Sequence, residues 1–219
     1  MIDAMAWMDQ FLQALEQTFG DRIRFVGLQG SYGRGEATER SDLDPVVILD
    51  DVAPADIRAY DAVLDTLPHR EKLCGFFGGQ NQLLNWDAAD LFQFYYDTAP
   101  VFGSLDGWLP RPDGAAADGA IKMGACAVYH GCIHNMLYDK SEDVLRDLYK
   151  SASFTVRAIC FRQTGAYVGR KDELMVAVSP REQGILGTYD CLKNGGTVDF
   201  ESMSGALFAW AKYWIEQTA

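Results

Sequence analysis

Two aspartates that are one residue apart, Asp42 and Asp44, are the residues of this chain best suited to chemistry. They stand directly before the wholly apolar run 46–49, which predicts a strand buried on both faces. Side chains alternate along an extended chain, so the two carboxylates are expected to point to the same side. Two carboxylates at a strand end are suitable ligands for a hard divalent cation such as Mg²⁺. The spacing therefore predicts a cation site.

A turn that precedes the aspartates has the composition of a phosphate site. Gly30 and Ser31 follow a short apolar run that predicts a strand, and they lead toward a helical segment. Open backbone N–H groups and a hydroxyl at such a turn bind phosphate, helped by the positive end of the helix. Arg34, one turn further on, is expected to reach the same anion. Its alternative is a surface ion pair with Glu36 or Glu39, which would stabilise little.

The segment from the glycine-serine turn to the second aspartate, GSYGRGEATERSDLD, resembles the signature of the DNA polymerase beta-like nucleotidyltransferase superfamily. The likeness is to its bacterial minimal and antibiotic-modifying (aminoglycoside or lincosamide) branch, and it covers roughly the first half of the chain. It implies a Mg²⁺-dependent enzyme that moves a nucleoside monophosphate, with ATP the favoured triphosphate donor, onto an acceptor hydroxyl. It also implies a third carboxylate that completes a site for two Mg²⁺ ions.

Asp90 is the residue that the resemblance favours as this third carboxylate. It opens the run DLFQF, which resembles the hydrophobic-Asp-hydrophobic strand of the family, although Ala89 stands where a larger aliphatic residue is usual. Asp97 closes the same predicted strand and is the rival, and Asp87 is a more distant candidate. The expected catalytic and metal-binding set is therefore Asp42, Asp44 and Asp90.

The stretch 147–152 (DLYKSA) resembles the helical domain that accompanies this fold in antibiotic-modifying members. The resemblance implies that Lys150 meets the triphosphate, together with Gly30, Ser31 and Arg34. It also implies an acidic residue that deprotonates the acceptor hydroxyl. Three candidates for this base stay open, namely Glu142, Asp143 and Asp147. The alternative for all of these charged residues is an ordinary solvated helix face.

Two further groups of residues have both a functional and a structural interpretation. His130 and His134 lie four residues apart on a predicted helix, with Cys126 four residues before them, which raises the question of zinc. Apolar neighbours and the lack of a ligating glutamate favour packed or surface histidines instead. The second group is aromatic. Some of its rings are expected to pack in the core and others to lie on a solvated face of the sheet, where some could contact a nucleotide base. Its members are Phe92, Phe94, Tyr95 and Tyr96.

The elements that must position these residues fall into two groups, and the predicted fold class is α+β. Residues 1–106 predict a nucleotidyltransferase domain, a mixed twisted sheet with flanking helices. Its helices are expected at 2–19 and 51–67, and its strands at 23–28, 46–49, 73–77 and 91–96. The Pro- and Gly-containing stretch 107–116 predicts a linker. Residues 117–219 predict a C-terminal helical bundle.

Composition narrows the range of binding partners expected for this chain. The net charge of −12 lacks the basic footprint of a nucleic-acid binder and disfavours a polymerase, whereas it suits a cationic small molecule. The N-terminal residues do not read as a signal peptide, no apolar run reaches membrane-spanning length, and the five cysteines contain no CxxC pair. These features predict a cytoplasmic protein with reduced thiols, no nucleic-acid partner and no membrane partner.

The favoured function is transfer of AMP from ATP, or of another nucleoside monophosphate, to a hydroxyl of a small molecule such as an aminoglycoside. Two alternatives stay open: an enzyme that transfers AMP to a protein, and a catalytically inactive, antitoxin-like binding module of the same fold. The presence of both aspartates of the metal motif argues against the inactive module. The sequence leaves the acceptor and the oligomeric state open.

Overall fold

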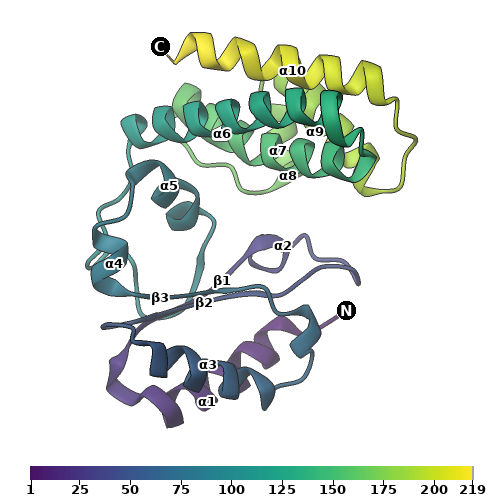
Figure 1. Cartoon of the computed structure of the whole chain (residues 1–219). Coiled ribbons are helices and arrows are strands. Elements are labelled where there is room, and N and C mark those ends of the chain that lie inside the picture. Colours follow the sequence, from purple (N-terminus) through teal and green to yellow (C-terminus); the bar gives the residue numbers. More distant parts are fainter. Residues whose placement is uncertain (219) are drawn as a thin grey trace. The chain divides into compact units, whose positions relative to one another are not determined.

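The computed structural model describes residues 1–218, and it contains two compact units (Figure 1). The first unit combines Met1–Asp87 with Phe94–Arg111. The second combines Ala88–Gln93 with the chain from Pro112 onward. The first unit holds the sheet and the second is helical, as expected for the α+β class.

The first unit is built on a mixed sheet of four strands in the order β3-β2-β1-β4. The central strand β1 is antiparallel to both β2 and β4, whereas β2 and β3 are parallel. The strand bounds are β1 Ile23–Gln29, β2 Asp44–Leu49, β3 Phe76–Gly79 and β4 Ala99–Phe102. This arrangement confirms the predicted mixed sheet.

Two helices cover one face of this sheet, which we call the core face (Figure 1). They are α1 (Ala4–Phe19) and α3 (Pro54–Asp65), and the short helices α2 (Gly30–Gly33) and α4 (Gln80–Leu84) follow β1 and β3. Asp3 caps α1 by accepting a hydrogen bond from the Ala6 amide. Phe11 and Leu15, spaced by one helical turn, are fully buried against the strands. The apolar stripe of α1 therefore anchors the sheet.

The second unit is a bundle of long helices joined by short turns. Its helices are α6 (Gly114–His134), α7 (Glu142–Thr164), α8 (Lys171–Ala177), α9 (Pro180–Lys193) and α10 (Phe200–Gln217), with a π-helical turn at Asn135–Asp139. Helices α6 and α7 approach closely, because a Cβ on Gly124 would meet the Thr155 hydroxyl at 2.1 Å. Gly165, with a φ of 75°, ends α7. Within residues 1–218, every helix is too short or too polar to cross a bilayer.

The predicted strand over 91–96 is wrong, because these residues belong to helix α5 (Ala88–Tyr96). A short apolar run does not distinguish a strand from a buried helix by its pattern. Tertiary packing selects the helix: Ala89 and Phe92, three residues apart, are both buried, and the Phe92 ring packs 5.0 Å from that of Phe161 in the second unit. The predicted strand at 73–77 is displaced, since β3 begins at Phe76.

Candidate functional site

The two aspartates flank a buried leucine at the start of β2. Leu43 is fully buried in the core-face cluster, whereas Asp42 is exposed and Asp44 is half-buried. Period-two alternation therefore places both carboxylates on the other face of the sheet, which we call the aspartate face. The backbone here is fixed, because the Leu43 amide donates to the Lys72 carbonyl (2.8 Å) and the Leu43 carbonyl accepts from the Cys74 amide (3.0 Å).

The glycine of the signature lies directly against the second aspartate. Gln29, the last residue of β1, is the cross-strand partner of Asp44, and Gly30 follows with a φ of +68°. A Cβ added to Gly30 would lie 1.9 Å from Asp44 Oδ2. Both the left-handed backbone and this close approach require glycine. The sequence thus brings the glycine-serine turn and the Asp44 carboxylate into one small region.

The serine of the signature offers a hydroxyl beside these carboxylates. Ser31 is half-buried in the one-turn helix α2, and its hydroxyl forms no hydrogen bond within residues 1–218. Its backbone is held, because the Glu36 amide donates to the Ser31 carbonyl at 2.7 Å. Gly33 anchors the turn, since a Cβ there would lie 2.5 Å from the Leu28 carbonyl oxygen. The turn is therefore rigidly placed, with a hydroxyl available to a ligand.

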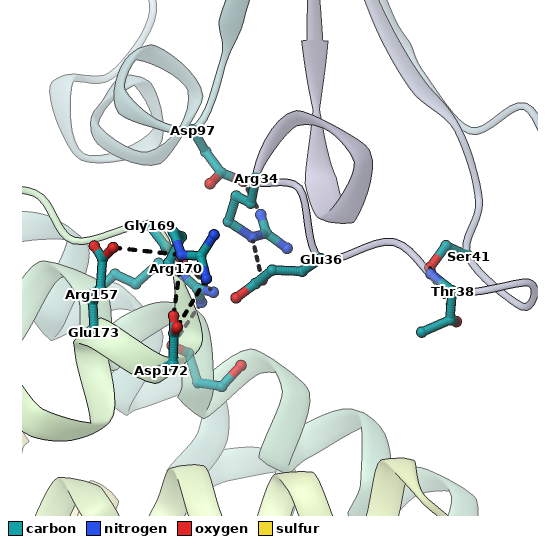
Figure 2. Close-up of polar contacts among 11 residues, drawn as sticks. Arg34, Glu36, Thr38, Ser41, Asp97, Arg157, Gly169, Arg170, Asp172 and Glu173 are labelled. Atoms are coloured by element: carbon teal, nitrogen blue, oxygen red, sulfur yellow. Dashed lines mark hydrogen bonds and ion pairs between the residues drawn. The ribbon is translucent and has the colours of Figure 1, made fainter. Parts of the chain in front are cut away.

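Arg34 is held by two carboxylates (Figure 2). Its Nη1 donates to Asp97 at 2.5 Å and its Nε to Glu36 at 3.1 Å, so the predicted alternative pairing with Glu36 is present. Burial opposes the charged form, but the two carboxylates outweigh it and raise the pKa of Arg34. The guanidinium thus ties the turn to Asp97, two residues before β4. Binding of phosphate by Arg34 stays a prediction.

A second tight turn leads into the first aspartate. The Thr38 amide donates to the Ser41 hydroxyl at 2.9 Å, and the Ser41 amide donates to the Thr38 carbonyl at 3.0 Å (Figure 2). Asp42 follows immediately, and its carboxylate has no ion-pair or hydrogen-bond partner among residues 1–218. An unpaired carboxylate on the same face as Asp44 is suited to a cation from solution.

The expected third carboxylate is not on a strand. Asp90 is exposed in the first turn of α5 and belongs to the second unit, because the segment folds as a helix. Within residues 1–218, no three His, Cys, Asp or Glu side chains gather in a way that would hold a metal. Asp97, the rival, is buried and bound to Arg34. A metal role for Asp90, and with it the second Mg²⁺, stays a prediction.

The carboxylate pair on its own fits one Mg²⁺. This ion binds through one or two protein carboxylates and takes its remaining oxygens from water and substrate phosphates. Asp42 and Asp44 supply that number of carboxylates, and the missing side chain of Gly30 lets the Asp44 carboxylate lie against the turn. The donor set is all oxygen, as this hard cation prefers.

The charged residues predicted on α7 differ in their surroundings. Glu142 and Asp143 both pair with Arg146, at 3.4 Å and 3.0 Å. Asp147 is exposed without a partner among the described residues, and Lys150 is also exposed. Of the three candidate bases, Asp147 is therefore the one with an unengaged carboxylate. The roles of Asp147 and Lys150 stay predictions.

Several other polar residues of the second unit have structural partners. The buried Arg157 donates to the Gly169 carbonyl, and Arg170 pairs with Asp172 at 2.8 Å (Figure 2). These contacts fix the turn between α7 and α8. His134 Nδ1 lies 3.1 Å from Asp139 Oδ2 on the exposed end of the helix that also carries His130 and Cys126.

Sequence reasoning missed Gln29, which links the site to the far edge of the sheet. Its Nε2 donates to the Thr98 hydroxyl at 2.6 Å and to the Phe94 carbonyl at 3.3 Å. Gln29 lies on the aspartate face, opposite Asp44. Its place directly before the glycine was the available signal, but the partner residues are distant in sequence.

Comparison with known proteins adds independent information. Residues 8–87 match the model of the nucleotidyltransferase domain family. Two proteins of Methanocaldococcus jannaschii, named "Putative protein adenylyltransferase" MJ1305 and MJ0604, are similar. The first is 51% identical over 41 residues, covering 19% of this chain and 28% of its own length. The second is 30% identical over 84 residues, covering 35% of this chain and 78% of its own length.

A solved structure shares the fold along nearly the whole chain. It is that of a spectinomycin adenyltransferase, AAD(9), from Enterococcus faecialis with ATP and spectinomycin. The superposition has a TM-score of 0.62 at 11% sequence identity and covers 98% of both chains. The likeness therefore includes the helices that follow residue 112 as well as the sheet.

Proposed function

This chain belongs to the nucleotidyltransferase superfamily, and on that premise we propose that it transfers AMP from ATP to a hydroxyl of a small molecule in a Mg²⁺-dependent reaction. One observation carries the proposal. Asp42 and Asp44 share one face of the sheet, and the backbone of Gly30 lies against the Asp44 carboxylate. This arrangement joins a cation site to a phosphate-binding turn.

Each residue has a defined task in this proposal. Asp42 and Asp44 hold Mg²⁺, which when bound stabilises negative charge on the triphosphate. The amides of the turn and the Ser31 hydroxyl hold phosphate oxygens. The acceptor hydroxyl gives up its proton to solvent or to a carboxylate base, and its oxygen forms a bond to the α-phosphorus. The bond from that phosphorus to the bridging oxygen breaks, and pyrophosphate leaves with the electron pair. Positioning and charge stabilisation account for the catalysis.

The donor and the acceptor rest on analogy and charge. The solved adenyltransferase contains ATP and spectinomycin and aligns over both units, which supports ATP and a small hydroxyl-bearing acceptor. The net charge of −12 favours a cationic acceptor such as an aminoglycoside. A second candidate is a protein hydroxyl, because the two similar archaeal proteins carry the name of protein adenylyltransferases.

Calorimetric titration with ATP, with and without Mg²⁺, tests the donor site. Wild type is expected to bind ATP in a Mg²⁺-dependent manner, and Asp42→Asn/Asp44→Asn is expected to lose that dependence. Asp51→Asn is the matched control, because Asp51 is an exposed carboxylate beyond the opposite end of β2. Binding that is identical in all three proteins would contradict the proposal.

Incubation with ATP labelled at the α-phosphate distinguishes the acceptors. The proposal predicts label on a small molecule from a panel of aminoglycosides and spectinomycin, with release of pyrophosphate. Label that appears only on protein would favour the second candidate. Mg²⁺-dependent ATP binding without transfer to any acceptor would favour the inactive binding module instead.

A further inference from the structure

Three aromatic side chains of the first unit form a cluster that the chemistry above leaves without a role. The cluster consists of Phe76, Trp86 and Phe94, and we call it the aromatic cluster. The Phe76 ring lies 5.6 Å from the Trp86 ring and 5.0 Å from the Phe94 ring, at interplanar angles of 51° and 62°. Such tilted and edge-to-face contacts are favourable for aromatic pairs. The three rings therefore form one packed group.

The strand register places this cluster on the aspartate face. Phe76 is the partner of Val46 in the parallel β2–β3 pair, and Val46 follows Asp44 by two residues. The next residue, Phe77, stacks on Tyr60 on the core face, with ring centroids 4.3 Å apart. Since side chains alternate, Phe76 points to the side that carries Asp44. A two-residue rise and one strand spacing separate the Asp44 and Phe76 Cα atoms by about 8 Å.

The exposure of the cluster suits a ligand. Trp86 is 44% exposed, whereas Phe76, which its ring contacts, and Phe94 are half-buried. Tryptophan side chains are usually well buried in folded proteins. The exposed part of the Trp86 ring is apolar surface that folding by itself does not bury. A flat apolar partner would cover it.

We propose that Trp86, supported by Phe76 and Phe94, stacks on the nucleobase of the donor triphosphate. This inference rests on the proposed function, because the triphosphate must be held at Asp42 and Asp44. The Phe76 Cα lies about 8 Å from the Asp44 Cα, so a ribose and base can reach from a phosphate chain held at Asp44 to the aromatic cluster. Every nucleobase has a π face, and stacking on an aromatic side chain does not need a particular base.

The nucleobase suits this surface better than the acceptor does. Every nucleoside triphosphate carries a flat ring, which a ribose joins to the phosphates. A hydroxyl-rich acceptor instead needs polar partners for the groups that it buries. The aromatic cluster supplies apolar faces.

Paired titrations with Mg²⁺-ATP and Mg²⁺-tripolyphosphate test the inference, because tripolyphosphate has the phosphate chain without the base. Trp86→Ala is expected to weaken ATP binding about tenfold to a hundredfold and to leave tripolyphosphate binding unchanged. Trp86→Phe is expected to retain most of the ATP affinity. Leu84→Ala is the matched control, since Leu84 is 43% exposed nearby in the chain but lies outside the cluster; its ATP affinity should equal that of wild type.

The titrations distinguish failure of the stacking role from failure of the proposed function. Unchanged ATP affinity in Trp86→Ala, or equal loss for ATP and tripolyphosphate, would overturn the stacking role while the proposed function stands. Failure of wild type to bind either compound would overturn both proposals. Should Trp86→Ala not fold, fluorescence decides: ATP is expected to quench wild type more than Trp86→Phe, and equal quenching would contradict the inference.

Discussion

The two faces of the sheet are made from the same strands but differ at the point where β2 begins. On the core face, Leu43, Val47 and Leu49 are fully buried against α1 and α3. On the aspartate face, Asp42 and Asp44 stand where β2 begins, with Gly30 in contact with Asp44, whereas Val46 and Ile48 further along the strand are fully buried. Asp42 and Asp44 carry charges of the same sign, and a bound cation would offset the repulsion between them. Burial of the core face therefore provides the stability that holds Asp42 and Asp44 on the aspartate face.

The largest effect is expected when the aspartate face is changed without changing its shape. Asp44→Asn should lower the rate of nucleotidyl transfer by about a thousandfold, because loss of metal-mediated charge stabilisation costs several kcal/mol. The midpoint of urea unfolding should stay close to that of wild type. Pyrophosphate release measures the first quantity. Retained activity in Asp44→Asn would show that the aspartate face is not needed for nucleotidyl transfer.

The converse change is Leu43→Ala, one residue away on the core face. Removal of a fully buried leucine should lower the free energy of unfolding by about 2–5 kcal/mol. Urea denaturation measures this loss. Activity of the folded fraction should remain within a few-fold of wild type. A stable but inactive Leu43→Ala would show that the two faces are not separable.

Gly30→Ala sharpens the comparison, because Gly30 touches the aspartate face through its backbone alone. The added Cβ would meet Asp44 Oδ2 at 1.9 Å and displace it, so Mg²⁺-ATP affinity should fall about tenfold. Gly35→Ala is the control, since Gly35 has the same kind of backbone (φ +70°) but nothing within 4 Å of an added Cβ. Both variants should lose about 1–2 kcal/mol of stability from left-handed strain. Equal ATP affinity in both variants would show that the contact between Gly30 and Asp44 does not affect ATP binding.

The smallest expected effect is a pH dependence at the edge of the core face. The hydrogen bond from Arg22, followed by that from the Ala53 amide, lowers the pKa of Asp56 to about 2. A depressed pKa stabilises the fold above the unfolded pKa of about 3.9, and this contribution is lost as the pH falls toward 2. The melting temperature of wild type should therefore fall more between pH 5 and pH 2 than that of Asp56→Asn. Parallel pH profiles for the two proteins would contradict this.

The residues best predicted from sequence are those whose signals are local. The spacing of Phe11 and Leu15 predicted α1, and the apolar run after Asp44 predicted β2. The glycine-serine turn and the two aspartates were found as one signature, and the fold brings Gly30 and Asp44 into contact. Local pattern was sufficient because sheet alternation and the turn act over a few residues.

Features that depend on distant contacts escaped prediction. Helix α5 was expected to be a strand, because the burial of Phe92 against Phe161 is not visible in a short apolar run. Strand β4 pairs with β1 across some seventy residues of sequence, and it too was missed. The assignment of Asp90 to a strand fell with that error. The partner of Arg34, Asp97, was likewise beyond local reasoning.

Electron paramagnetic resonance of Mn²⁺, a spectroscopic substitute for Mg²⁺, tests the central claim most directly. In the presence of ATP, wild type is expected to bind Mn²⁺ and to broaden its signal. Asp42→Asn/Asp44→Asn is expected to leave the signal of Mn²⁺-ATP unchanged, because the protein ligands are gone. If the double variant binds Mn²⁺-ATP as wild type does, the aspartate face is not the cation site, and the account of this enzyme is wrong.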